Sequence, residues 1–396
     1  MAFAKALKPI RIPQGSRAHW VLRLIGFGAI VYLALSPFFR NLKANEYGQL
    51  IDILILGLAA TSLNLLVGFT GQISIGHSAF FGIGAYTTAI LMHNYGWEPQ
   101  WTFPMAVLLC FAVGVLVGIP ALRLTGIYLS LVTLALAQLF PALVRKFDNL
   151  TGGSRGIQNL RYDPPSWTGL SRSTLDRSIW LYAVALTFMV IGYYVVRNLV
   201  KSRIGRAMVA VRDNTTAAAV MGVHVAVVKT VTFGISAALC GLAGSVFVLR
   251  QTQANPDNIY YTILGAIIFL VIMVIGGTAS LLGPIVGAFV YYRVDEFTRS
   301  LPNKDWLPGA AKDFLRDRPN LATVVFSALL ILLMFVAPFG IVGLAKRFGR
   351  RFVVLVPRLP GGGGGQEAGT APEAVEAIPA TPLETAASAL PTQGGP

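Results

Sequence analysis

The chain has 396 residues, of which 55% are hydrophobic and only 12% are charged, and its formal net charge is +15. A soluble domain carries about 25% charged residues, so the composition excludes a soluble protein and indicates an integral membrane protein with many spans. The basic residues lie mainly in short loops and at the two ends of the chain, a distribution that sets membrane topology and does not indicate a nucleic-acid-binding protein.

A helix needs about 20 apolar residues to cross a bilayer. The segments that approach this length are 20–38, 50–67, 73–92, 101–119, 127–144, 178–196, 229–249, 262–276, 281–292 and 321–343. The segment 73–92 is predicted either to span or to be re-entrant. The segment 281–292 is too short to span alone and is predicted to be a half-helix after a break at Gly276 and Gly277. The predicted fold is an all-α polytopic membrane protein with about 10 transmembrane or half-membrane helices.

The connection 197–229 carries six basic residues against one acid, Asp213, and is therefore predicted to be cytoplasmic. Counting spans in both directions from this connection places both chain termini in the cytoplasm. The loops 145–177 and 293–320 then fall on the extracytoplasmic side. The first of them carries several arginines, against the usual charge rule, whereas the second is nearly neutral.

This topology divides the chain into three parts. Residues 1–19 are predicted to be a basic cytoplasmic N-terminus, and residues 20–345 the transmembrane permease domain. Residues 346–396 are predicted to be a basic cytoplasmic flank followed by a disordered tail rich in Gly, Pro and Ala.

Residues 63–86 read LNLLVGFTGQISIGHSAFFGIGAY, a membrane-like segment broken by glycines and polar residues. Polar groups in hydrocarbon need partners, and broken glycine-rich helices are found along transport paths. The candidate path-lining residues are Asn64, Gln72, Ser74, His77 and Ser78. For any one of them, a hydrogen bond between helices, worth about 0.6 kcal/mol, is the favoured role.

Five stretches of the chain resemble, in order and spacing, the LivM-type permease subunits of branched-chain amino acid ABC transporters. They are residues 63–91 (LNLLVGFTGQISIGHSAFFGIGAYTTAIL), 126–138 (GIYLSLVTLALAQ), 151–157 (TGGSRGI), 202–223 (SRIGRAMVAVRDNTTAAAVMGV) and 276–288 (GGTASLLGPIVGA). The closing span, FSALLILLMFVAPFGIVGL, is also similar to the last helix of that family, so the resemblance covers about residues 20–350.

The segment 202–225 contains a short helix signal. Asp213, Asn214 or Thr215 can cap its N-terminus and Gly222 its C-terminus, with about two turns between them. So short a helix with apolar residues needs a partner surface. The resemblance implies that this cytoplasmic helix docks on the ATPase and transmits its closure. The alternative is a helix that lies on the membrane surface.

The resemblance also assigns the residues that couple the permease to the ATPase, and the sequence departs from the family pattern in two places. The coupling residues are Arg206, Arg212, Asp213, Asn214 and Gly222. Glutamates that are frequent in the family's short helix are missing from residues 215–219, which puts acidic contacts with the ATPase in doubt. Arg155 stands where the family often has Asp or Asn, which bears on contact with a binding protein or on substrate preference.

The sequence has no G-x-x-x-x-G-K-[ST] motif for ATP phosphates, and its four histidines have no metal-ligand spacing. We therefore expect no catalysis, no cofactor and no metal on this chain, and ATP-Mg on partner subunits. The resemblance implies a permease for branched-chain or related amino acids in the bacterial inner membrane. Its implied partners are a second, LivH-like permease subunit, two ATPase subunits and an extracytoplasmic substrate-binding protein.

Two other functions remain open from the sequence. The same class of permease also serves urea, short amides or aromatic acids. A stand-alone secondary transporter or channel is the other alternative, but it predicts ionisable residues inside the spans, and this chain has almost none.

Overall fold

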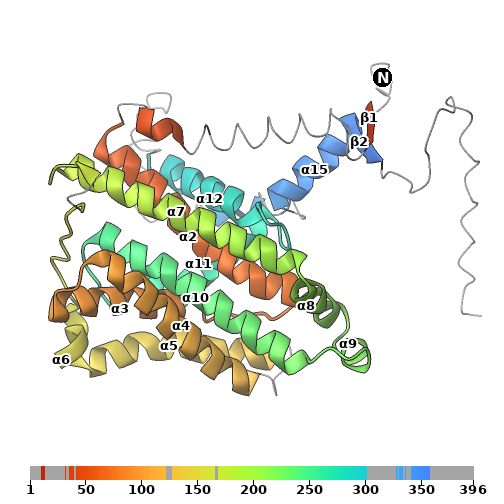
Figure 1. The fold of residues 1–396 in the computed structure, drawn as a ribbon, viewed down its shortest axis with the longest axis horizontal. Helices are drawn as coiled ribbons and strands as arrows, with labels where there is room; N and C mark the ends of the chain where they lie inside the picture. The colour runs from red at the N-terminus through yellow and green to blue at the C-terminus, as the bar shows by residue number, and fades with distance from the viewer. Residues whose placement is uncertain are drawn as a thin grey trace, which may run out of the picture.

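The computed structural model describes residues 42–121, 127–165 and 168–300, with shorter pieces at 10–13, 32, 35–39, 327–328, 330–332, 335 and 340–356. Most of the described chain is helical (Figure 1). Its α-helices are α2 (Ala44–Thr70), α3 (His77–Tyr95), α4 (Pro99–Ala121), α5 (Ile127–Lys146), α6 (Asp148–Thr151), α7 (Thr174–Lys201), α8 (Arg203–Asp213), α9 (Thr215–Val220), α10 (Val225–Gln251), α11 (Ile263–Gly276), α12 (Gly283–Ser300) and α15 (Gly340–Phe352).

Four short elements complete the described structure. The 3-10 helices are η1 (Gly153–Arg155) and η3 (Ile259–Tyr261). The strands β1 (Ile10–Pro13) and β2 (Val353–Val356) pair in parallel, with Ile10 opposite Val353. Both strands lie beyond the helical bundle, at the outer end of α15 (Figure 1).

Five of the described helices are long and apolar enough to cross a membrane, so the chain is a multi-pass membrane protein. They cover Ala44–Thr70, Pro99–Ile119, Tyr128–Lys146, Thr174–Lys201 and Val225–Gln251, and Ile263–Gly276 is a shorter apolar helix. Each of them matches a predicted segment. The predicted spans 20–38 and 321–343 lie mostly outside the described residues, so the total of about ten and the cytoplasmic termini stay predictions.

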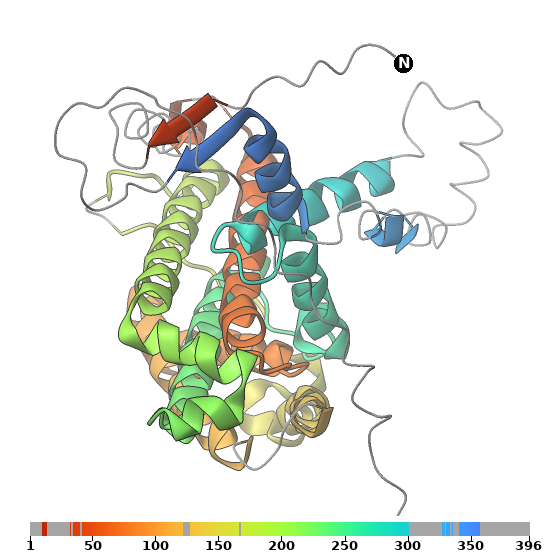
Figure 2. The ribbon, with the colours of Figure 1, turned by 90° about the vertical axis from the view of Figure 1, so that its right-hand side faces the viewer.

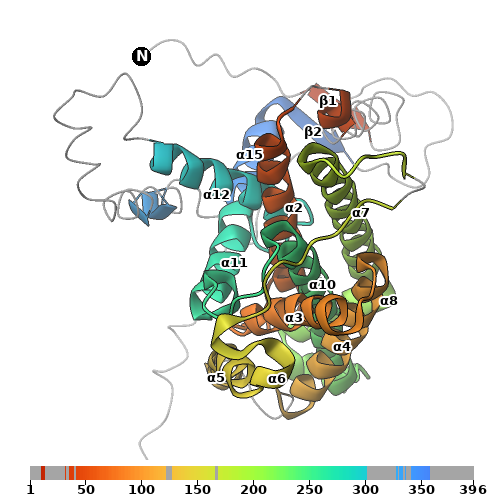
Figure 3. The same cartoon turned by 90° about the vertical axis from the view of Figure 1, so that its left-hand side faces the viewer.

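Two helices, α2 and α10, form the centre of the bundle. Their apolar windows are 78% and 89% buried, against 33% for those of α4, α5 and α7. In two perpendicular views α3 lies between α2 and the pair α5 and α6 (Figures 1 and 3). The outer helices leave large apolar side chains exposed, such as Leu108 and Leu116 on α4 and Leu131 on α5. Lipid or a partner subunit is therefore expected to cover these faces.

Helix α12 is longer than predicted. The sequence placed a half-helix at 281–292 and a loop from residue 293, but α12 continues to Ser300. Its last turns carry ion pairs at helical spacing, Arg293 with Glu296 and Arg299 with Asp295, each at 2.9 Å. Such pairs stabilise a polar helical extension, which is why the end of the apolar run did not mark the end of the helix.

Glycines set the distance between α3 and α10. A Cβ atom on Gly84 would overlap the carbonyl oxygen of Gly241, and one on Gly244 would overlap that of Phe81. Small residues in membrane helices let two backbones approach closely in this way. This packing holds the first half of α3 against α10, one of the two central helices.

We expect Gly84→Ala to destabilise the protein by about 1–3 kcal/mol, because the added methyl group forces α3 away from α10. The measurement is the midpoint of thermal unfolding in detergent. Gly118→Ala is the matched control, because a Cβ there meets Thr230 at 3.4 Å, an ordinary contact. Equal midpoints for the two variants would contradict the close packing of α3 on α10.

Candidate functional site

The chain is non-helical between α2 and α3, and side chains from α5 hold this break. Helix α2 ends at Thr70 and is capped by Gly71, whose φ of 71° is left-handed. The Ile75 amide donates a hydrogen bond to the Thr133 hydroxyl at 3.1 Å. The Ser130 hydroxyl donates to the Ile73 carbonyl at 3.2 Å. Backbone groups that have left the helical ladder therefore find their partners on a neighbouring helix, as a low-dielectric environment requires.

His77 begins α3 and joins three helices through buried hydrogen bonds. The Ser236 hydroxyl of α10 lies 2.5 Å from the Ser62 carbonyl, to which it must donate. Ser236 therefore accepts from His77 Nε2–H at 2.7 Å, and the Ser74 hydroxyl donates to His77 Nδ1 at 3.1 Å. This pattern assigns a neutral imidazole with its proton on Nε2. Both ring nitrogens of His77 are thus used for structure.

A second break separates α11 from α12, and Asn64 of α2 binds it. The Asn64 side-chain oxygen accepts a hydrogen bond from the Ala279 amide at 2.9 Å, and its side-chain amide donates to the Ser280 carbonyl at 2.8 Å. Ala279 has a φ of 56°, a left-handed conformation that costs a non-glycine residue about 1–2 kcal/mol. Asn64 stabilises that conformation and satisfies the exposed backbone. The break predicted at Gly276 and Gly277 is confirmed.

The five residues predicted to line a path are all buried, and they divide into two groups. Asn64, Ser74 and His77 are engaged in the bonds just described. Gln72 Nε2 and Ser78 Oγ are buried atoms for which the described residues supply no hydrogen-bond partner. Among these five, Gln72 and Ser78 are therefore the ones with unused polar groups, and contact with a transported molecule stays a prediction for all five.

The segment 202–225 folds into two short helices at one end of the bundle (Figures 1 and 2). Asn214 is the N-cap of α9, and its side-chain oxygen accepts from the Ala217 amide at 2.9 Å. Gly222 follows α9 with a φ of 83°, which favours glycine. The predicted caps are thus correct. Helix α8 was missed, although the spacing of its buried Gly205, Met208 and Val211 was the available signal.

The predicted coupling residues lie on different sides of this segment. Arg206 is exposed. Arg212 binds Asp213 through Nε at 3.0 Å and donates from Nη1 to the Gly68 carbonyl of α2 at 3.0 Å. Beyond them, Val220 and Met221 are 82% and 83% exposed. These two large apolar side chains at the end of α9 therefore form an exposed apolar surface that no other described residue covers.

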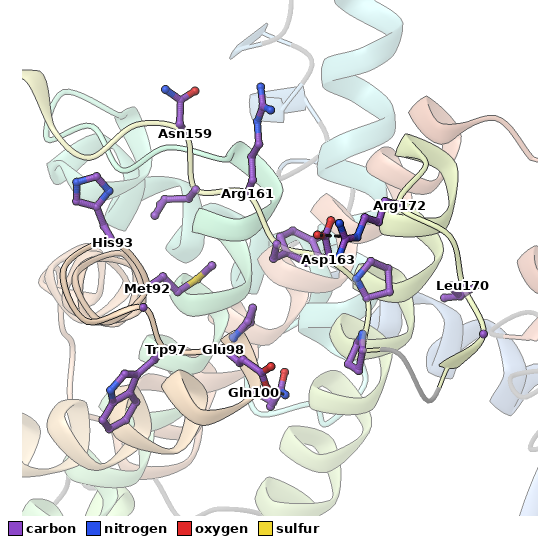
Figure 4. Close-up of a pocket in the computed structure, with 17 residues that line it drawn as sticks. Met92, His93, Trp97, Glu98, Gln100, Asn159, Arg161, Asp163, Leu170 and Arg172 are labelled. Atoms are coloured by element: carbon purple, nitrogen blue, oxygen red, sulfur yellow. Dashed lines mark hydrogen bonds and ion pairs between the residues drawn. The ribbon is translucent and has the colours of Figure 1, made fainter.

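The opposite end of the bundle has a cleft of about 900 Å³ (Figure 4). One wall is formed by the end of α3 and the turn into α4, with His93 and Trp97. The other wall is formed by residues 159–165 together with Gly169, Leu170 and Arg172. Asp163 binds Arg172 at 3.2 Å and Arg177 at 2.7 Å. The cleft is therefore open, polar and fixed by ion pairs.

Three of the five arginines that broke the charge rule in 145–177 have acidic partners. Arg172 and Arg177 share Asp163, and Arg145 pairs with Asp257 from the connection between α10 and η3. A fourth pair, Arg250 with Asp52 at 3.6 Å, joins α10 to α2. The positive charge at this end is therefore partly compensated, whereas the end with α8 and α9 has one acid against six basic residues.

Comparison with known proteins agrees with this architecture. Residues 48–334 match the family described as "Branched-chain amino acid transport system / permease component". The chain is 30% identical to the high-affinity branched-chain amino acid transport system permease protein LivM of Escherichia coli, over 87% of this chain and 82% of that protein.

More distant relatives include another permease of that system and one with a different named cargo. LivH of Salmonella typhimurium is 24% identical over 72% of this chain and 90% of its own length. The autoinducer 2 import system permease protein LsrC of an Enterobacter species is 28% identical over 68% and 75%. No solved structure matches the chain.

The apolar helices form a membrane-spanning bundle, and two helix breaks with buried polar residues lie inside it. These features are typical of a multi-pass membrane permease. The extent of the match shows that the chain belongs to the branched-chain amino acid transport system permease family, and that it is a LivM-type member. The resemblance inferred from the five sequence motifs is confirmed.

We expect opposite effects from two buried serines. Ser236→Ala leaves the His77 Nε2–H without an acceptor and should cost about 1–3 kcal/mol. Ser78→Ala removes a buried hydroxyl that has no partner and should leave stability unchanged or raise it. The measurement is the thermal midpoint of each purified variant. A loss of stability in Ser78→Ala equal to that in Ser236→Ala would refute the bonding pattern around His77.

Proposed function

We propose that this chain is a permease subunit of an ABC importer that moves branched-chain or related amino acids across the bacterial inner membrane. ATP hydrolysis on separate subunits drives the transport. The observation that carries the proposal is the α8–α9 segment, in which an apolar tip projects from the basic end of a permease of this family. An apolar surface of this kind fits a protein cleft better than water.

The proposed orientation places α8 and α9 in the cytoplasm. The excess of basic residues at that end supports this assignment by the positive-inside rule. The partial compensation of charge at the opposite end supports an extracytoplasmic location for the cleft with Asp163. This orientation agrees with the predicted topology, in which loops 145–177 and 293–320 face outward and both termini lie inside.

The proposed assembly contains a second permease subunit, two ATPase subunits and an extracytoplasmic substrate-binding protein. LivM and LivH name two permease proteins of one transport system, and this chain is similar to both, which supports a permease pair. The exposed apolar faces of α4 and α5 offer surfaces for such a pair or for lipid. The binding protein is proposed to dock over the cleft in Figure 4.

In the proposed mechanism, closure of the ATPase dimer moves the segment 202–225, and the permease alternates between outward- and inward-open states. Gln72 and Ser78 are the proposed contacts for the transported molecule, because their polar atoms have no partner among the described residues. An amino acid carboxylate is also suited to the backbone amides and helix ends at the two breaks.

The named relatives also leave a second cargo class open. LsrC belongs by its name to an autoinducer 2 import system, so similar permeases serve substrates other than amino acids. Urea, short amides and aromatic acids are the alternatives within this class, and a stand-alone transporter is the alternative outside it.

ATP-dependent uptake of labelled leucine into proteoliposomes that contain all subunits tests the proposal. We expect uptake that requires ATP, the ATPase and the binding protein. Uptake that persists without the ATPase would refute an ABC importer. ATP-dependent uptake of another cargo, with none of leucine, would refute only the proposed substrate.

We expect the double variant Val220→Asp and Met221→Asp to lose the ATPase. Two carboxylates at the apolar tip would be desolvated in an interface, which lowers affinity at least about tenfold. The measurement is the amount of ATPase that copurifies with the permease. Leu150→Asp is the control, because Leu150 is an exposed apolar residue at the opposite end. Unchanged copurification in the double variant would contradict docking through α9.

A further inference from the structure

We propose that Arg212 and Asn64 are positioning residues that connect the cytoplasmic α8–α9 segment to the break between α11 and α12. The last turns of α2 form the connection between them. The inference rests on the proposed function, because it identifies how movement of the coupling segment reaches the interior of the permease. It concerns contacts within this chain and does not depend on the identity of the cargo.

The first contact joins α8 to the end of α2. Carbonyl groups in the last turn of a helix lack intrahelical partners. At this end the amide of Gly71 donates to Val67 and that of Gln72 donates to Leu66, which leaves the Gly68 carbonyl to other donors. Arg212 Nη1 donates to it at 3.0 Å. A guanidinium at a helix C-terminus is also favoured by the helix dipole.

Packing makes this contact specific. A Cβ atom on Gly71 would lie 2.8 Å from Arg212 Cγ, so the arginine stem lies directly over the cap of α2. Met208, one turn earlier on α8, is fully buried with Leu65 and Phe69 of α2. Asp213 binds the same guanidinium and fixes its orientation. Helix α8 is thus attached to α2 by both apolar and polar contacts.

The second contact joins α2 to the distant break. Asn64 lies one helical turn before Gly68 and binds both Ala279 and Ser280, as described above. A Cβ atom on Gly68 would lie 2.7 Å from the Ala279 amide nitrogen, so the loop lies against the backbone of the same turn. Residues 64–68 therefore contact the coupling segment on one side and the break on the other.

A rigid turn between two polar contacts transmits displacement. If α8 moves when the ATPase closes, the Gly68 carbonyl and the Asn64 side chain move with it. The left-handed Ala279 depends on Asn64 for its hydrogen bonds, so the break rearranges as α2 shifts. Loss of either contact should leave ATP hydrolysis intact. Hydrolysis should then no longer be coupled to rearrangement of the break between α11 and α12.

The experiment uses the full complex in proteoliposomes and the variants Arg212→Met and Asn64→Leu. Leu282→Cys, introduced beside the break where Leu282 is 40% exposed, reports on the loop through its rate of reaction with a maleimide. Cys110 and Cys240 are both buried, so background reaction should be low. The rate is compared with and without a non-hydrolysable ATP analogue. The ratio of molecules transported to ATP hydrolysed is measured in parallel.

In the Leu282→Cys protein we expect the analogue to change the labelling rate. In both contact variants that change should disappear, and the transport ratio should fall about tenfold, the usual size of an allosteric coupling. Lys201→Met is the control, because it also removes one exposed positive charge, from the end of α7 beside α8. It should behave as wild type. Copurification of the ATPase with each variant separates loss of transmission from loss of docking.

Two results would overturn the proposed connection through Arg212 and Asn64. Normal nucleotide-dependent labelling and a normal transport ratio in Arg212→Met and Asn64→Leu would overturn it. A labelling rate in the Leu282→Cys protein that does not respond to nucleotide would also overturn it. If the wild-type complex hydrolyses ATP but takes up no amino acid, the proposed substrate fails, and the labelling result still decides whether the two contacts transmit motion.

Discussion

The structure depends on one constraint: backbone groups released where a helix breaks inside a membrane must find partners in the protein. Water is scarce there, and each unsatisfied group costs several kcal/mol (about 4–8 in an alkane reference). Two such breaks occur among the described residues, one between α2 and α3 and one between α11 and α12. Side chains from α5 bind the first, through Thr133 and Ser130, and Asn64 of α2 binds the second. The breaks are therefore specific structures with assigned partners.

This constraint changes the interpretation of the polar residues in 63–86. Polar side chains in a membrane segment indicate a transport path, but they are equally required to satisfy a break. His77 and Asn64 have their hydrogen-bonding groups occupied by other parts of the protein, which explains their burial without a substrate. Gln72 and Ser78 remain distinct, because an unsatisfied buried group is costly unless something binds it. The same segment therefore contains both structural and candidate transport residues.

The sequence predicted the helices that are uniformly apolar and the caps that have strong local signals. Asn214 and Gly222 are examples, since a side-chain cap and a positive φ are determined by neighbouring residues. The end of α12 was missed because ion pairs, which apolar length does not detect, extend it to Ser300. Helix α8 was missed because its three buried residues are few and include a glycine.

Hydrogen bonds and ion pairs between residues far apart in the chain could not be predicted from a single sequence. Arg212 had the appearance of a charged contact for a partner, yet it donates to a carbonyl 144 positions away. Three of the five arginines of 145–177, which are an exception to the charge rule, have Asp163 or Asp257 beside them. Such contacts depend on tertiary packing, whereas caps and spans depend on local sequence.

The arrangement of α2 and α10 explains how one short segment can act on both breaks. Helix α10 follows α9 directly in the chain, and its Ser236 binds His77 at the start of α3 and the Ser62 carbonyl of α2. Helix α2 receives α8 at Gly68 and binds the second break through Asn64. In the proposed mechanism, a displacement of the α8–α9 segment would reach the first break through α10 and the second through α2. Because Ser236 also links these two central helices, the breaks are expected to respond together.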